Sequence, residues 1–226
     1  MGFLLPLSIF AFGVTATAAV TVRERGKARS IRRALFDRGA SVFSGARITH
    51  ALDGFPRLAA AWNDHNIRAE LIPDTMTIRR LPQLWLSVTI EARLPVPADC
   101  AVLARPSGND FYSLTERLPV PLSPPRSFPF EILVRGSAPS AQAIIDALEA
   151  PIASILRDPR VKEVAVTRKG LRIIRQASEG RRGAHLLLRQ AVFDDADVAP
   201  DEVLRLLGIL DDLRKSVRPG LKLVAA

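Results

Sequence analysis

The sequence predicts an α+β fold in which a single N-terminal transmembrane helix precedes a mainly antiparallel sheet packed with two or three helices. Two observations carry this prediction. Residues 3–22 contain no charge, and a helix of that length spans the roughly 30 Å hydrocarbon core of a bilayer. Beyond them, short runs rich in β-branched and large apolar residues alternate with proline and glycine, and two stretches show helical periodicity.

The net charge is concentrated in one segment. The chain of 226 residues carries +9, and residues 23–47 hold eight Lys or Arg against Glu24 and Asp37, a surplus of +6 that leaves +3 elsewhere. A nucleic-acid-binding protein usually carries its basic residues on the folded domain, so this distribution argues against nucleic acid as a partner. Cys100 is the only cysteine, which excludes a disulfide scaffold.

The order of the apolar and basic segments predicts a topology. No Lys or Arg precedes the apolar run, and the basic cluster follows it at once. The positive-inside tendency then predicts a single-pass protein of a bacterial-type inner or cytoplasmic membrane, with the N-terminus outside and the C-terminal domain in the cytoplasm. A cleaved signal peptide, with a cleavage-like site at residues 16–18, and a buried core helix are the alternatives. The expected parts are an anchor at 1–22, a basic juxtamembrane segment at 23–47 and a soluble α+β domain at 48–226.

The residues expected to contact the membrane or a partner lie in or beside this anchor. Its small residues would let another helix approach closely, and the basic side chains would lie beside acidic lipid headgroups. These contact residues are Phe3, Leu4, Phe10, Phe12, Gly13, Arg23, Arg25, Lys27, Arg29, Arg32 and Arg33.

The remainder of the chain divides into expected strands and helices. Residues 41–70 are expected to form a connector with a short helix at 58–62, where three alanines lie in a row. Further along, the pattern predicts strands at 84–90, 100–104 and 128–134, a helix at 138–158 kinked or split by Pro151, a hairpin of 161–167 and 171–176, a strand at 185–190 and a helix at 200–217.

Few residues point to catalysis or metal binding. No P-loop, HExxH or GxSxG motif occurs. His50 and His65 lack the further ligands that a metal site needs, so no metal and no cofactor is expected. Cys100 lies in an apolar run and is expected to fill core volume rather than to act as a nucleophile. The acidic residues 194, 195 and 197 precede a helix, where they are expected to favour its positive end.

One loop remains a candidate anion site. Gly180 and Gly183 flank Arg181 and Arg182, so backbone amides and two guanidinium groups could together bind an anion. A plain hairpin loop is the alternative.

These features predict a non-enzymatic, membrane-anchored accessory or scaffold subunit of a larger integral membrane complex, for example a photosynthetic, respiratory, transport or secretion complex. Its expected partners are other integral membrane subunits and acidic lipid headgroups. Two alternatives stay open. One is a membrane-tethered anion- or lipid-binding sensor domain that uses Arg181 and Arg182, and the other is an enzyme of unrecognised type around Cys100 or the acidic residues 194–197.

Overall fold

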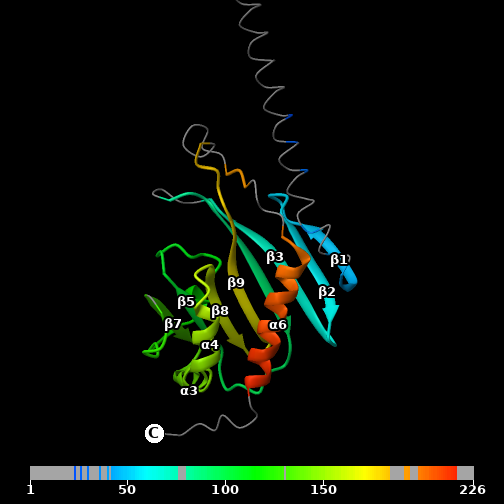
Figure 1. The fold of residues 1–226 in the computed structure, drawn as a ribbon. Helices are drawn as coiled ribbons and strands as arrows, with labels where there is room; N and C mark the ends of the chain where they lie inside the picture. Colours follow the sequence, from blue (N-terminus) through cyan, green and yellow to red (C-terminus); the bar gives the residue numbers. More distant parts are fainter. Residues whose placement is uncertain are drawn as a thin grey trace, which may run out of the picture.

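The computed structural model describes residues 23, 26, 30, 36, 40, 42–75, 80–129, 131–183, 191–193 and 198–217. The strands among them form one nine-stranded sheet in the order β1-β2-β3-β4-β9-β8-β5-β7-β6, and every pairing is antiparallel (Figure 1). The strands are β1 (Ser44–His50), β2 (Pro56–Trp62), β3 (His65–Asp74), β4 (Gln83–Glu91), β5 (Cys100–Ala104), β6 (Val120–Leu122), β7 (Ile132–Gly136), β8 (Val161–Thr167) and β9 (Gly170–Glu179). The helices are α3 (Gln142–Ala147), α4 (Glu149–Leu156) and α6 (Pro200–Ser216), with 3₁₀ turns η2 (Leu114–Arg117) and η3 (Pro139–Ala141).

The helices cover one face of the sheet. α6 packs against β4 and β9, and α4 packs against β8 and α6 (Figure 1). Val88 and Ile173 of the sheet and Leu207 of α6 are fully buried in the same hydrophobic core. Because side chains alternate along a strand, the neighbours of Val88 and Ile173 point to the opposite face. That opposite face carries the polar features described below.

The predicted fold class is wrong. The described residues form one antiparallel sheet of nine strands with few helices, and none of those helices is long and apolar enough to cross a membrane. The longest of them, α6, has 17 residues and is amphipathic, with charged residues such as Asp212 on its exposed side. The predicted transmembrane segment at residues 3–22 lies outside the described residues. The first strand begins at Ser44, and Phe36 is fully buried in the core, so both lie within the segment expected to be a basic linker.

The short helix predicted at 58–62 is also wrong, because these residues belong to β2. Leu58 and Ala60 are buried while Arg57 and Ala59 are exposed, which is the alternation of a half-buried strand. The alanines favour a helix intrinsically, but pairing with two neighbouring strands overrides this weak preference. The turn at Asn63–Asp64, where both residues have positive φ angles of 45° and 61°, joins β2 to β3.

Several predicted elements are confirmed with shifted ends. The hairpin of β8 and β9 and the helix α6 lie where the periodicity placed them. The helix predicted at 138–158 is split at Leu148, three residues before Pro151, because proline offers no amide to the preceding turn. The strand predicted at 128–134 begins later, at Ile132, and the one predicted at 185–190 lies outside the described residues.

A glycine closes the β8–β9 hairpin and allows a testable contrast. Gly170 has a φ of +148°, and a Cβ there would collide with the carbonyl oxygen of Ile90. Gly170→Ala should therefore lower the free energy of unfolding by roughly 3 kcal/mol. Gly208 lies in the middle of α6, where an added Cβ would meet no atom within 4 Å. Gly208→Ala should therefore raise the free energy of unfolding by about 1 kcal/mol, because alanine favours the helix. Urea unfolding followed by circular dichroism would measure both, and equal effects of the two variants would contradict the structure.

Candidate functional site

The face of the sheet opposite α6 carries a groove of about 740 Å³, which we call the sheet-face groove. Strands β2, β3, β4, β9 and β8 form its floor, and the 3₁₀ turn η2 forms one wall. Polar side chains and small residues predominate in it. Its lining consists of Thr49, Arg57, Leu58, Ala59, Arg68, Ala69, Glu70, Ser87, Thr89, Glu91, Leu114, Arg117, Ala165, Thr167, Lys169, Gly170, Leu171 and Arg172.

The strand register explains why this part of the sheet is hollow. One row across the floor runs through Ala59, Arg68, Thr89, Arg172 and Ala165, each paired with the next on the neighbouring strand. Both ends of the row carry only a methyl group, while the middle carries long or hydroxylated side chains. The hollow is therefore set by residue size at fixed positions of the register, since paired side chains lie on the same face of an antiparallel sheet.

The lining of the groove is basic on balance. Five cations face two carboxylates, which gives a surplus of three positive charges. Arg57 Nε lies 3.3 Å from Glu70 Oε2, and Arg68 pairs with Glu91. Such exposed pairs contribute at most about 1 kcal/mol each, so their guanidinium groups are not locked to these partners.

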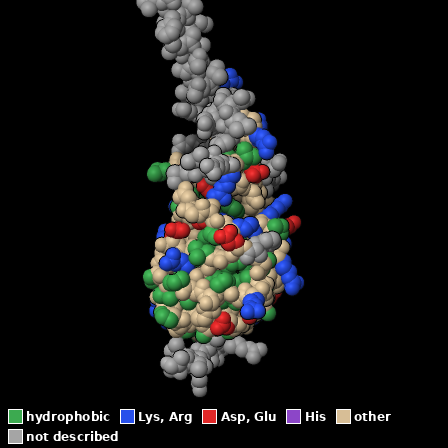
Figure 2. Space-filling model, turned by 90° about the vertical axis from the view of Figure 1, so that its left-hand side faces the viewer, with side chains coloured by type: hydrophobic (Ala, Val, Ile, Leu, Met, Phe, Trp, Pro, Cys, Tyr) green, Lys and Arg blue, Asp and Glu red, His purple; other side chains and the backbone are tan. Residues whose placement is uncertain are grey.

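Two other cations of the groove have no such partner. The side chains of Arg117 and Lys169 are exposed and make no hydrogen bond or ion pair with the described residues. Elsewhere charge is mixed: on the side of the molecule shown in Figure 2, basic, acidic and hydrophobic side chains are interspersed. The groove thus combines a concave shape with two uncompensated cations.

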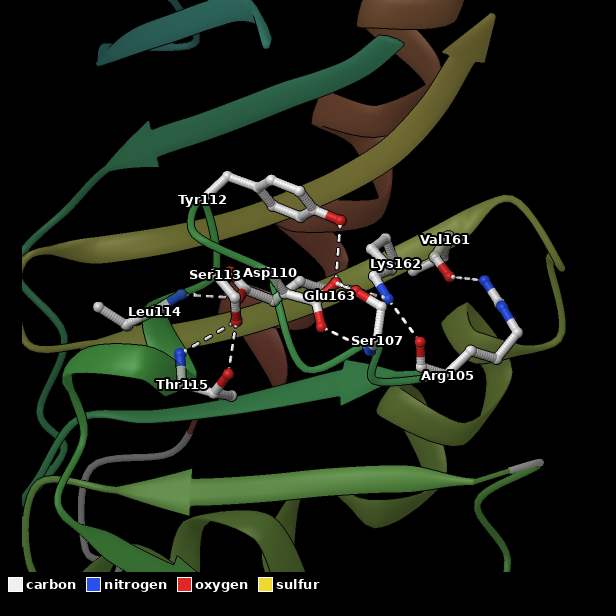
Figure 3. A network of polar contacts seen from close by, with 10 residues as sticks. All are labelled: Arg105, Ser107, Asp110, Tyr112, Ser113, Leu114, Thr115, Val161, Lys162 and Glu163. Carbon is white, nitrogen blue, oxygen red and sulfur yellow. Dashed lines mark hydrogen bonds and ion pairs between the residues drawn. The ribbon is translucent and has the colours of Figure 1, made fainter. Parts of the chain in front are cut away.

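A β-bulge positions the wall of the groove. Val161 pairs with Arg175 and Glu163 pairs with Ile174, so Lys162 is an extra residue in β8. The side chains of Lys162 and Glu163 both reach the β5–β6 connector, residues 105–119, which contains η2 (Figure 3). The bulge therefore provides two neighbouring charged anchors beneath the same segment.

The first anchor is a buried ion pair. Lys162 Nζ lies 3.0 Å from Asp110 Oδ1 and also donates to the carbonyl oxygen of Arg105 at 2.6 Å (Figure 3). Asp110 further accepts the Ser107 amide at 2.7 Å, the Ser107 hydroxyl at 2.8 Å and the Tyr112 hydroxyl at 3.2 Å. Burial alone would raise the pKa of Asp110, but the hydrogen bonds from Ser107 and the charge of Lys162 outweigh it and lower that pKa below 3.8.

The second anchor links the wall to the floor. One oxygen of Glu163 accepts hydrogen bonds from the Ser113 hydroxyl and from the Leu114 amide, the latter at 2.8 Å. The other accepts Arg172 Nη2 at 2.5 Å. Ser113 in turn caps η2 by accepting the Thr115 amide at 3.1 Å. Glu163 is fully buried, so a single carboxylate fixes both the start of η2 and a groove arginine.

A third buried carboxylate on this face accepts no hydrogen bond from the residues that the structure describes. Asp74 is 1 % exposed, and neither of its oxygens accepts a hydrogen bond from a described residue. Trp85 lies beside it, and its indole N–H acts to lower the pKa of Asp74, although Nε1 completes no hydrogen bond of normal geometry with a described residue. Burial raises the pKa of Asp74 above its ordinary value, and the positive charges of Arg80 and Lys162 do not cancel this effect. Asp74 is therefore in an unfavourable environment when ionised.

The structure places only a few of the predicted contact residues. Arg23 is exposed, whereas ten others lie outside the described residues: Phe3, Leu4, Phe10, Phe12, Gly13, Arg25, Lys27, Arg29, Arg32 and Arg33. Arg181 and Arg182 are both exposed. In their loop the amides of Gly180 and Arg181 donate to the carbonyl oxygens of Pro82 and Val192, at 2.7 and 2.8 Å. These two amides are engaged within the fold, and the anion loop stays a prediction.

The structure does not bring the other chemically active residues together. His50 and His65 pair with Pro56 and Trp62, at opposite ends of β2, about 20 Å apart along the strand. Cys100 is buried within β5, and burial raises the pKa of its thiol to about 12. A thiol in that state is a poor nucleophile at neutral pH. The acidic residues 194, 195 and 197 lie outside the described residues.

Sequence reasoning missed the residues that form the groove and its anchors. Arg57 and Arg68 lay in a segment interpreted as a connector, and Asp110 lay between expected strands. One signal was present in the sequence: the charged pair Lys162–Glu163 interrupts an otherwise apolar strand. Charged residues at buried strand positions are rarely found without a partner, so this pair predicts polar groups packed above it.

Removing the first anchor should be costly. Asp110→Asn leaves Lys162 buried without an anionic partner and should lower the free energy of unfolding by about 3–5 kcal/mol at pH 7. The pKa of Asp110 in the folded protein lies below the unfolded value of 3.8. Its contribution to the free energy of unfolding is therefore complete above pH 3.8 and is lost as the pH falls through the folded pKa. Urea unfolding at pH 7 and pH 3 would measure this. The exposed Asp212→Asn is the control, and a loss of similar size there would refute the assignment.

Asp74→Asn should change the free energy of unfolding at pH 7 in the opposite direction from Asp110→Asn. The folded pKa of Asp74 is raised, so its ionisation penalty appears as the pH rises above the unfolded value of 3.8. The variant should therefore be more stable than the natural chain at pH 7 and close to it at pH 3. The same unfolding series checks this result. Destabilisation at pH 7 would show that the Asp74 carboxylate has a stabilising partner.

Comparison with known proteins leaves the family open. No protein-family model and no curated protein matches the chain. Among solved structures, the chain matches the crystal structure of the mycobacterial trehalose monomycolate transport factor A, TtfA, with 11% sequence identity and a TM-score of 0.42. The match covers 84% of this chain and 99% of that one.

Proposed function

We propose that this protein is a non-enzymatic accessory or scaffold subunit of a larger assembly, and that its sheet domain docks onto that assembly through the sheet-face groove. The observation that carries the proposal is a basic groove whose wall is fixed by two buried ionic anchors. The wall therefore needs no ordering when a partner arrives. A pre-organised surface loses less conformational entropy on binding than one that must first be ordered.

The chemistry of the lining supports docking better than turnover. The groove presents arginine side chains, which have five N–H donors each in a planar fork, together with threonine hydroxyls. No described serine or threonine of the lining is hydrogen-bonded to a histidine or carboxylate that could act as its general base. The thiol of Cys100 is buried, and burial raises its pKa to about 12, which disfavours the reactive thiolate. These observations favour binding over covalent or acid–base catalysis.

The location of the assembly remains a prediction from the sequence. The basic segment at 23–47 favours a membrane surface with acidic lipid headgroups, and integral membrane proteins are the corresponding partners. Arg23, the basic residue of the predicted contact set that the structure describes, is exposed and so is available for such a contact.

Site-specific photo-crosslinking in the cells that make the protein would test the docking surface. The crosslinker is placed at Ala59, an exposed position in the groove, and for comparison at Asp212, which is 81% exposed on α6. We expect a discrete larger adduct from the Ala59 position, absent from the Asp212 position, and elution of the intact protein with an assembly larger than the monomer. Identical adducts from both positions, or a monomer with no adduct from Ala59, would show that the docking proposal is wrong.

A further inference from the structure

We infer that the occupant of the sheet-face groove is an extended, acidic segment of a partner protein. This inference rests on the proposed docking function and names the chemistry of the partner. Three properties of the groove support it: its charge, its length across the strands, and the kinds of side chain that its lining lacks.

The uncompensated charge of the lining calls for at least two negative charges, because buried Glu163 beneath the floor already pairs with Arg172. Five cations and two carboxylates leave a surplus of three. Two of these cations, Arg117 on η2 and Lys169 at the β8–β9 turn, are exposed and unpaired with any described side chain. A third, Arg172, is held by buried Glu163 but remains partly exposed, at 24%. A carboxylate in the groove would meet these cations without breaking a buried ion pair.

The dimensions of the groove suit an extended chain. Its floor spans five neighbouring strands, from β2 to β8, and four strand spacings amount to about 19 Å. An extended peptide covers that distance with about six residues. Alternate side chains of such a segment point the same way, so three of the six would face the floor. Acidic residues at these alternate positions would match the length of the groove and could meet Arg117, Lys169 and the partly exposed Arg172.

The lining argues against a lipid or a nucleic acid as the occupant. None of its described residues is aromatic, so bases would find no stacking platform. The exposed large hydrophobic residues of the described chain are Val42, Leu52 and Phe111, and none of them lines the groove, so the apolar contacts open to an acyl chain come mainly from alanines and partly buried Leu114. Among the lining leucines, Leu58 and Leu171 are only 1% exposed. Carboxylates along an extended polypeptide fit this lining, because they need neither an aromatic platform nor a large apolar surface.

Binding of a defined probe to the full chain tests the inference. The probe is a fluorescein-labelled hexapeptide that alternates glutamate with serine, and the matched peptide replaces every glutamate with glutamine. Fluorescence anisotropy at low salt should give at least about tenfold tighter binding of the acidic peptide. Raising the salt to 0.5 M should weaken that binding, because the contacts are solvent-exposed.

Charge variants locate the binding to the groove. Arg117→Gln combined with Lys169→Gln should weaken binding of the acidic peptide by about tenfold. Arg126→Gln combined with Arg157→Gln removes the same charge from exposed positions outside the groove and should leave binding within about twofold. Charge reversal, with Arg117→Glu and Lys169→Glu, should abolish binding of the acidic peptide and favour a peptide that alternates lysine with serine.

Each other outcome is informative. Equal binding of the glutamate and glutamine peptides, or equal losses in the groove variant and its control, would overturn the acidic occupant. Tighter binding to vesicles with anionic lipid, or to a single-stranded oligonucleotide, than to the acidic peptide would also overturn it. If the Ala59 position still forms its adduct while the acidic peptide fails to bind, the docking function stands and only the chemistry assigned to the partner is wrong.

Discussion

The buried carboxylate of Glu163 is the constraint on which this face of the protein depends. It lies where a bulge in β8 turns two charged residues toward the same side, and it accepts hydrogen bonds from the start of η2 and from Arg172 of the groove floor. Removing a charge from water is costly, and only a full set of donors offsets that cost. Moving the connector away from the sheet would remove these donors from Glu163 and break the Lys162–Asp110 pair, so both anchors hold the connector where it forms the groove wall.

Buried charge on this face acts in two opposite ways. Asp110 accepts hydrogen bonds from Ser107 and pairs with Lys162, so its ionised form is stabilised. Asp74 completes no hydrogen bond with a described residue, and its ionised form is disfavoured. The two aspartates differ in their neighbours and not in their depth, since both are about 1% exposed. Burial alone thus says little about the energetic role of a carboxylate. The hydrogen-bond donors and positive charges around it decide whether its pKa is raised or lowered.

The elements that could be predicted from the sequence are those whose signal lies within one segment of the chain. The β8–β9 hairpin and α6 follow from periodicity within one segment, and the break before Pro151 follows from the chemistry of a single residue. The three-strand meander of β1 to β3 could not be found this way, because the alanines of β2 favour a helix until two neighbouring strands pair with them. The groove could not be predicted from the sequence for a related reason. Its floor residues Arg68, Thr89 and Arg172 become neighbours only through the pairing register of three strands.

The environment of Cys100 has a practical consequence for studies of this protein in solution. It is the only cysteine of the chain, it lies inside β5, and its thiol has a pKa of about 12. Thiol-directed dyes and spin labels react with accessible thiolates, so the natural chain should remain unlabelled while it is folded. A cysteine introduced on the groove rim can then carry the sole label without replacement of Cys100. Labelling of Cys100 itself would report that the core has opened.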